Sequence, residues 1–169
     1  MRNELADIPL TDGTESGRAR PRYLRLLLSA AVVVLVDQVT KEMALRWLDD
    51  GPFDIVSGAI TLRLAYNSGG AFGILSGMPG VFLLATLAVV ALILVWVRSI
   101  DDERWIVPLG LIVGGGLGNV TDRVVRDLDG RVVDFVDLHV WPVFNVADMA
   151  IVTGVGLLII FGSRERSAE

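Results

Sequence analysis

The stretch that decides the fold is residues 80–97, GVFLLATLAVVALILVWV, which carries no charged side chain. It lies within an uncharged run from Leu64 to Val97, and a second uncharged run extends from Trp105 to Thr121. A helix needs about 20 mostly apolar residues to cross the hydrocarbon core of a bilayer. Runs of this length therefore indicate a protein that folds in a membrane, because soluble domains break their apolar segments into short periodic pieces.

The composition of the whole chain agrees with a membrane protein. Of its 169 residues, 53% are hydrophobic, and the mean hydropathy is +0.59. The formal charge is −5, with much of the acid in the N-terminal tail and loops, so nucleic acid is not an expected partner. The absence of cysteine excludes disulfides, thiolate metal sites and a cysteine nucleophile. His139, the single histidine, is too few for a histidine-rich metal site.

Four membrane spans are expected, at about residues 24–47, 80–97, 105–121 and 143–162. The first and last reach full length only by including ionisable residues: Asp37 and Lys41 in the first, Asp148 in the last. A secretory signal peptide is the alternative for the first segment, but the residues before Asp37 offer no small-residue cleavage site. The predicted domain organisation is a disordered tail at 1–20, an integral membrane domain at 21–163 and a tail at 164–169.

The loops between the spans carry strand patterns. Residues 60–66 alternate apolar and polar side chains, and residues 132–140 do so after a turn signal at Asp129-Gly130. Asp134 is the one acid on the apolar face of the second of these strands. The sequence therefore predicts a helical membrane protein with some strand structure outside the spans.

The basic residues predict the orientation. Nine of the fifteen lie in the N-terminal tail, the turn at 98–104 and the C-terminal tail, which the positive-inside rule places in the cytoplasm. With four crossings, both termini are then cytoplasmic, and the unusual polar motifs all fall on the outer side. These motifs are DQVTK at 37–41, NSGGAFG at 67–73, GGGLGNVTDR at 114–123, VDF at 133–135 and FNVAD at 144–148.

Asp134 and Asp148 are the natural pair for acid/base chemistry. Two carboxyl groups brought close together cannot both ionise, so the charged one can activate a water while the neutral one hydrogen-bonds a scissile carbonyl. The alternatives are a helix N-terminal acid for Asp148 and a solvated loop carboxylate for Asp134. Asn67 and Asn145 suit amide clamps on an extended peptide, or equally buried amides that satisfy loop backbone.

Two pairs of residues in the spans lie four positions apart and share a helix face. Asp37 and Lys41 form either a salt bridge at a helix end or a functional intramembrane pair. Lys41 is the single lysine beside fourteen arginines, which hints that an ammonium is specifically required there. Asn119 and Arg123 suit the holding of a carbonyl or a carboxylate.

Two further functions stay open on the residues alone. A small transporter or channel subunit would use the intramembrane aspartates to relay protons or bind cations. A membrane scaffold would use the stripe formed by Gly110, Gly114 and Gly118, where small residues let helices pack closely. We interpret this stripe as a packing surface.

At the five polar motifs the sequence resembles the lipoprotein signal peptidase (signal peptidase II) family, whose pattern includes D-Q-x-T-K, N-x-G-x-A-F-G, G-N-x-x-D-R, V-x-D-F and F-N-x-A-D in this order. The likeness covers roughly residues 24–162. It implies a membrane α-helical fold with four transmembrane helices and a small extracytoplasmic β-cradle, without metal or cofactor. The implied activity is aspartyl cleavage of diacylglyceryl-modified prolipoproteins just before the lipidated cysteine.

The resemblance also implies roles for particular residues. The catalytic acids correspond to Asp134 and Asp148, and the substrate-binding or supporting residues to Asp37, Lys41, Asn67, Gly69, Asn119, Arg123 and Asn145. Expected partners are lipidated prolipoproteins and membrane lipid, and the expected state is a monomer in the bacterial cytoplasmic membrane with its active site facing outward. The acidic tail before Arg18 and Met149 after the last motif depart from the family pattern.

Overall fold

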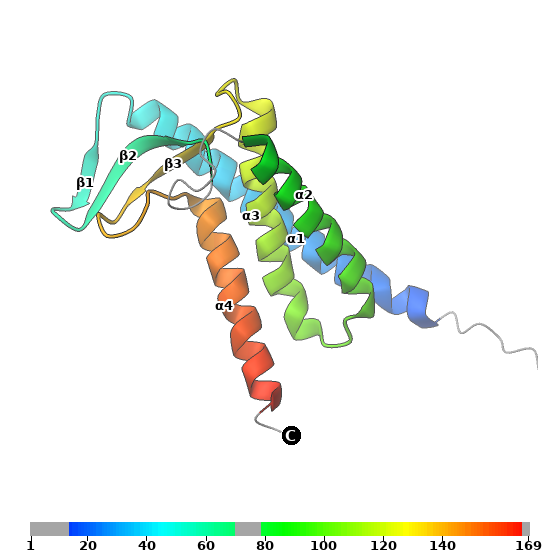
Figure 1. The fold of residues 1–169 in the computed structure, drawn as a ribbon. Coiled ribbons are helices and arrows are strands. Elements are labelled where there is room, and N and C mark those ends of the chain that lie inside the picture. The colour runs from blue at the N-terminus through cyan, green and yellow to red at the C-terminus, as the bar shows by residue number, and fades with distance from the viewer. Residues whose placement is uncertain (1–13, 70–78, 167–169) are drawn as a thin grey trace, which may run out of the picture.

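The structure, a computed structural model, describes residues 14–69 and 79–166, and it consists of long helices with a small sheet at one end (Figure 1). The helices are α1 (Thr14–Trp47), α2 (Pro79–Trp96), α3 (Ile106–Val125) and α4 (Val146–Arg166). Short 3₁₀ turns at Val97–Ser99 and Glu103–Trp105 connect α2 to α3. Each of the four expected spans is thus a helix.

Three helices within the described residues are long and apolar enough to cross a membrane: Pro21–Trp47, Gly80–Ser99 and Val146–Arg164. On α2, the residues Leu84 and Leu92 are 69% and 67% exposed. Large apolar side chains exposed in this way are unfavourable in water but are well accommodated by lipid. α3 is less apolar because its second half carries Asn119, Asp122 and Arg123, and it packs against the other three helices. The chain is therefore a multi-pass membrane protein in which α3 is the central helix.

The expected disordered tail at residues 1–20 needs one correction. α1 begins at Thr14, so residues 14–20 continue the first span as helix. Adding a residue to an existing helix is far easier than nucleating a new one, which allows a polar segment without its own apolar period to extend the span. Residues 1–13 lie outside the described part of the chain.

The predicted glycine stripe brings α3 close to its neighbours. A Cβ atom at Gly114 would lie 2.7 Å from the backbone oxygen of Ala30 on α1, so no larger residue fits there without movement. On another face of α3, Gly115 is pressed against the backbone of Ala147 at the start of α4. The interpretation of the stripe as a packing surface is confirmed, and this packing sets the polar end of α3 between α1 and α4.

The sheet consists of β1 (Phe53–Val56), β2 (Ile60–Asn67) and β3 (Val132–Asp137), antiparallel in that order. β2 and β3 confirm the two predicted strands, whereas β1 was not predicted because its four exposed residues carry little periodic signal. The second predicted strand, at 132–140, ends earlier, at Asp137. The chain then turns at His139, which has a φ of 61°.

Two contacts fix the sheet on the helices and prepare the site. Phe135 of β3 packs with Ala44 and Leu48 at the end of α1. The backbone oxygen of Phe144 then accepts hydrogen bonds from the N–H groups of Phe135 and Val136 at 3.0 and 2.9 Å. The chain therefore returns to β3 immediately before α4 begins, which brings residue 145 beside residue 134.

Candidate active site

Asp134 lies in β3 with its side chain turned into the molecule, and it is only 2% exposed. Asn67 Nδ2, on the neighbouring strand β2, donates a hydrogen bond to Asp134 Oδ2 at 3.0 Å, and Asn145 Nδ2 donates to Oδ1 at 2.6 Å. Burial, together with the nearby negative charge of Asp148, raises the pKa of the Asp134 carboxyl to about 7. This group can therefore hold a proton near neutral pH.

Asp148 lies in the first turn of α4. Its Oδ1 accepts a hydrogen bond from Asn119 Nδ2 at 2.9 Å, and its Oδ2 accepts one from the backbone N–H of Asn145 at 3.2 Å. In return, the N–H of Asp148 donates to Asn145 Oδ1 at 2.9 Å, so the two residues form a reciprocal cap at the start of the helix. Asp148 is thus both a helix-start acid and a neighbour of Asp134.

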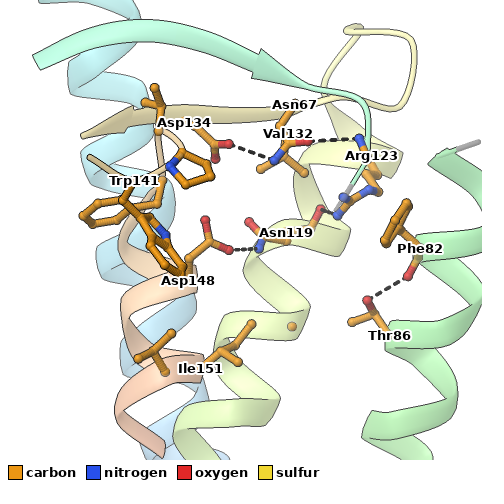
Figure 2. Close-up of a pocket in the computed structure, with 16 residues that line it drawn as sticks. Asn67, Phe82, Thr86, Asn119, Arg123, Val132, Asp134, Trp141, Asp148 and Ile151 are labelled. Atoms are coloured by element: carbon orange, nitrogen blue, oxygen red, sulfur yellow. Dashed lines mark hydrogen bonds between the residues drawn. The ribbon is translucent and has the colours of Figure 1, made fainter. Parts of the chain in front are cut away.

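Asn145 joins the two carboxyl groups. Its side chain is fully buried, and its Nδ2 reaches Asp134 Oδ1 at 2.6 Å and Asn119 Oδ1 at 3.1 Å. Because Oδ1 of the same amide accepts from the N–H of Asp148, one side chain touches both acidic residues. Figure 2 shows the two carboxyl groups facing the same space, one from β3 and one from α4.

Both acids line a cavity of about 320 Å³. Its polar end is formed by Asn67, Asn119 and Arg123 beside the two carboxyl groups. Its other walls are largely apolar and come mainly from α2, α4 and the segment 141–144 that precedes α4; Figure 2 shows Phe82 of α2 and Ile151 of α4. The cavity therefore combines a pair of buried acids with a surface suited to hydrocarbon chains.

Arg123 contributes a cation to the polar end of this cavity. One terminal nitrogen donates to the backbone oxygen of Asn119 at 3.3 Å, and the guanidinium carbon lies 6.0 Å from the centre of the Phe82 ring. Its Nε is buried and has no hydrogen-bond partner among the described residues. A buried donor of this kind is costly to leave unpaired, so it suits an acceptor on a bound molecule.

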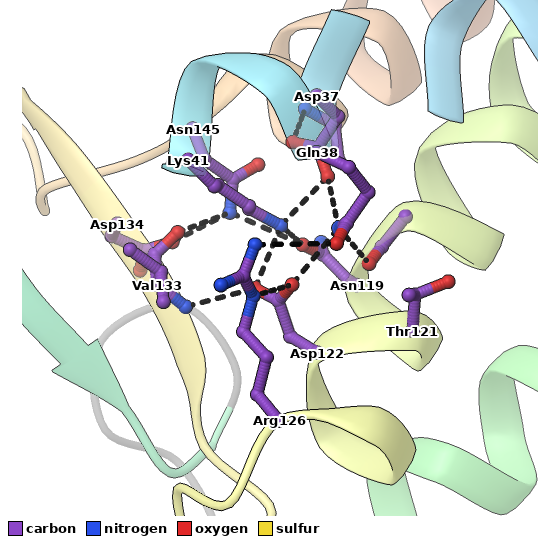
Figure 3. A network of polar contacts seen from close by, with 12 residues as sticks. Asp37, Gln38, Lys41, Asn119, Thr121, Asp122, Arg126, Val133, Asp134 and Asn145 are labelled. Atoms are coloured by element: carbon purple, nitrogen blue, oxygen red, sulfur yellow. Dashed lines mark hydrogen bonds and ion pairs between the residues drawn. The ribbon is translucent and has the colours of Figure 1, made fainter. Parts of the chain in front are cut away.

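A second polar cluster, built around Lys41, lies next to Asn145 and Asp134 (Figure 3). Lys41 Nζ contacts Asp37 Oδ2 at 2.8 Å, Asp122 Oδ2 at 2.9 Å and Asn119 Oδ1 at 3.0 Å. The side chains of Lys41, Asp37 and Asp122 are fully buried. All three ammonium protons are therefore used, and Arg126, whose Nε lies 3.1 Å from Asp122 Oδ1, supplies the second positive charge for the two carboxylates.

With this geometry established, the chain can be compared with known proteins. A model of the family described as Signal peptidase (SPase) II matches residues 29–163, which is most of the chain. The protein belongs to the signal peptidase II family. It is accordingly a protease, and the resemblance carried by the five polar motifs is confirmed.

Individual relatives of signal peptidase II type agree with this assignment. The lipoprotein signal peptidase of Mycobacterium tuberculosis is 43% identical over 164 residues, covering 90% of this chain and 81% of the relative. That of Rhodococcus jostii is 38% identical over 168 residues, covering 94% and 85%. None of these names supports the transporter or channel alternative.

Two solved structures, each described as a bacterial membrane enzyme, share the fold. One, solved at 2.3 Å, has a TM-score of 0.76 with 30% sequence identity and covers 85% of this chain and 90% of its own. The other, solved at 1.9 Å, has a TM-score of 0.70 with 32% identity and covers 80% and 90%. The membrane α-helical fold class with its small sheet is therefore shared with membrane enzymes.

The structure brings the predicted site residues together, although their roles stay a prediction. Asp134, Asp148, Asn67, Gly69, Asn119 and Arg123 all line the cavity. Asn145 is bonded to both acids, and Asp37 and Lys41 lie in the second polar cluster. Asn67 also accepts a hydrogen bond from the N–H of Gly69 at 2.9 Å, so it satisfies loop backbone as well. Residues 70–73 of the second motif lie outside the described residues.

Sequence reasoning missed two polar residues of this signal peptidase II site. Asp122 stands in the motif at 114–123 but was given no role of its own, yet it is fully buried and pairs with Lys41. Gln38 Nε2 donates to Asp122 Oδ1 at 2.9 Å and to the backbone oxygen of Gly118 at 3.2 Å. The spacing of Asp122 three residues after Asn119 was the available signal, because it places both on one helix face.

Proposed function

We propose that this protein is an aspartyl endopeptidase that removes signal peptides from diacylglyceryl-modified prolipoproteins by cleaving just before the lipidated cysteine. The observation that carries the proposal is the pair of buried acids, Asp134 and Asp148, joined by Asn145 at the polar end of a cavity with apolar walls. A lipid-modified peptide needs polar groups at its scissile bond and an apolar surface for its acyl chains. Family membership supports the substrate class.

The proposed chemistry uses one proton on the pair. Asp134, with its pKa raised to about 7, holds that proton, and Asp148 is ionised. Asp148 takes a proton from a water whose oxygen attacks the scissile carbonyl carbon, while Asp134 donates its proton to the carbonyl oxygen. The tetrahedral intermediate then collapses: its hydroxyl returns a proton to Asp134, the C–N bond breaks, and Asp148 passes its proton to the leaving amine.

The neighbouring side chains support these steps. Asn67 and Asn119 each donate to one of the two carboxyl groups and hold them in place. The free Nε donor of Arg123 suits a backbone carbonyl of the bound peptide. The proposed steps use only these side chains and a water molecule.

The proposed setting is the bacterial cytoplasmic membrane, with four crossings, both termini in the cytoplasm and the active site facing outward. The membrane domain then covers residues 21–163, with α3 as the crossing that the other helices shield. The acyl chains of the substrate lie against the apolar cavity walls from α2 and α4, near Phe82 and Ile151. The protein acts as a monomer in contact with membrane lipid.

The test is incubation of the purified protein with a synthetic lipidated precursor, followed by mass spectrometry of the products. We expect one cut, immediately before the modified cysteine, and none in the same peptide without the lipid. Asp134→Asn and Asp148→Asn should each abolish the product while the protein still inserts and purifies as the wild type does. Cleavage that persists in either variant rules out the aspartyl mechanism.

A further inference from the structure

The partners of Lys41 lead to the two acids by separate routes. Asp37, one carboxylate bound to Lys41, accepts the backbone N–H of Ala147 on its Oδ1 at 2.9 Å. Asp122, the other carboxylate, accepts the backbone N–H of Val133 on its Oδ2 at 3.0 Å. Ala147 and Val133 are the residues immediately before Asp148 and Asp134. One ammonium thus links the backbones from which both acids project.

The third donor of Lys41 acts on Asp148 through Asn119. It bonds to Asn119 Oδ1 at 3.0 Å, which also accepts from Asn145 Nδ2 at 3.1 Å. These two donors leave the NH₂ group of Asn119 pointing at Asp148 Oδ1, at 2.9 Å. Without the ammonium, only Asn145 Nδ2 still holds this oxygen, so the Asn119 amide can turn more easily and present its oxygen to the Asp148 carboxylate, which would repel it.

We propose that Lys41, Asp37 and Asp122 form a positioning centre that sets the separation and orientation of Asp134 and Asp148. This inference rests on the proposed peptidase function and adds a role for three buried residues that touch no substrate. The centre ties together α1, α3, β3 and the start of α4, and these four elements are distant in the sequence. It carries out no proton transfer of its own.

The chemistry of the centre explains why lysine is required. Its three acceptors lie at 2.8, 2.9 and 3.0 Å from one nitrogen, an arrangement that suits the compact ammonium. A guanidinium is planar and spreads its donors over three nitrogens, so it cannot meet all three acceptors from one point. Full burial of an ion pair is seldom the most stabilising choice, which favours a role beyond stability for these charges.

Other charged groups face the centre and complete its balance. Arg126 Nε donates to Asp122 Oδ1 at 3.1 Å, and a terminal nitrogen of Arg126 lies 3.4 Å from Glu42. Lys41 and Arg126 therefore offset the charges of Asp37 and Asp122. A neutral residue at position 41 leaves an excess negative charge near the two acids.

The first variant is Lys41→Met, which keeps the length of the side chain and removes its donors. We expect kcat on the lipidated precursor to fall by about 100-fold for each folded molecule, because a displacement on the order of 1 Å has this effect on a catalytic geometry. KM should change little, since no substrate contact is lost. The positive charge of Lys41 lowers the pKa of Asp134, so its removal should move the alkaline limb of the pH profile to higher pH.

The matched control is Arg46→Met on the same helix. Arg46 pairs with Glu42 at the same spacing of four residues, but this pair is largely exposed. The control should keep the wild-type kcat and pH profile. Equal kcat and an unmoved pH profile in folded Lys41→Met would overturn the positioning role, and loss of activity explained wholly by a smaller folded fraction would do the same.

Two further variants keep the test decisive. Lys41→Arg keeps the charge, so we expect the alkaline limb to stay in place while kcat remains low; full rescue of kcat contradicts the need for a three-point ammonium. If Lys41→Met is not recovered folded, Asp122→Asn replaces it, with an expected fall in kcat of about 10-fold or more and an unchanged KM. A wild-type kcat in folded Asp122→Asn refutes the centre. Failure of the wild-type protein to cleave any lipidated precursor instead refutes the proposed function.

Discussion

Replacing Gly118 by alanine tests how closely α3 must approach the buried charges of α1. A Cβ atom at this position would lie 2.6 Å from Asp37 Oδ2 and 3.3 Å from Ala147 Cβ. Ordinary contact begins near 3.4 Å, so the carboxylate has to move by about 0.8 Å. Asp37 holds the N–H of Ala147, so this displacement passes directly to the start of α4, where Asp148 lies.

Two consequences should follow from this displacement. Overpacking of a well-filled interior lowers the free energy of unfolding by about 1 to 3 kcal/mol. A shift of this size at a catalytic group lowers kcat by up to about 100-fold. Thermal unfolding in detergent measures the first effect, and cleavage of the lipidated precursor, normalised to folded protein, measures the second.

Two other glycines provide controls for the same substitution. Gly114→Ala presses on Ala30 and Val33 of α1 at 2.7 Å, away from the charged cluster, so it should destabilise the protein but lower kcat per folded molecule much less than Gly118→Ala does. Gly156 on α4 has open space around its Cβ position, so Gly156→Ala should leave activity intact and stabilise the helix by up to about 1 kcal/mol. Wild-type stability and kcat in Gly118→Ala would refute the reasoning.

Four further outcomes are expected. The activity on the lipidated precursor should fall as pH rises above the pKa of Asp134, which is about 7, because the pair of acids then loses the proton that it donates to the scissile carbonyl. An activity that stays constant well above this pH contradicts the role of Asp134 as the proton donor. The same raised pKa means that the folded protein binds this proton more tightly than the unfolded chain does, so the free energy of unfolding should decline from about pH 4 to about pH 7. In thermal unfolding measurements, Asp134→Asn should remove this part of the decline. Asn145→Ala removes the donor at 2.6 Å from Asp134 and should lower kcat by about 100-fold or more in the cleavage assay. Tyr23→Phe loses a hydrogen bond of 2.7 Å to the backbone oxygen of Leu94 at the far end of the bundle, so the unfolding free energy should fall by about 1 kcal/mol while kcat stays at its wild-type value.

Much of the architecture was predictable because it depends on local patterns. The run at 80–97 is long and apolar enough that only a membrane helix satisfies its backbone, and the structure places a helix there. Alternation at 60–66 and 132–140 predicts strands, because neighbouring side chains on a strand point to opposite faces, and the structure has β2 and β3 there, with β3 ending at Asp137. β1 escaped prediction since four exposed residues leave almost no pattern to detect.

The candidate site, too, was predictable in part from local patterns and in part not. Ordered polar motifs in an otherwise apolar chain identified Asp134, Asp148 and most of their neighbours, because a polar group within a membrane span needs a reason to be there. The motifs did not reveal which oxygen bonds to which amide. They also did not reveal that Asp122 belongs to the Lys41 cluster, since an acid at the end of a span has an ordinary explanation in solvent.

By itself, then, the sequence determined that the protein folds in a membrane, the order of its four helices and of two of its strands, and the residue types available for chemistry. All of these depend on side chains only a few positions apart. Tertiary structure alone decided the meeting of distant residues, such as Asp37 with the backbone of Ala147 across 110 positions. The physical reason is that such a bond forms only when close packing along the α3 glycines has already brought the helices together. No local sequence pattern encodes this close approach of the helices, and the proposed active site depends on the approach.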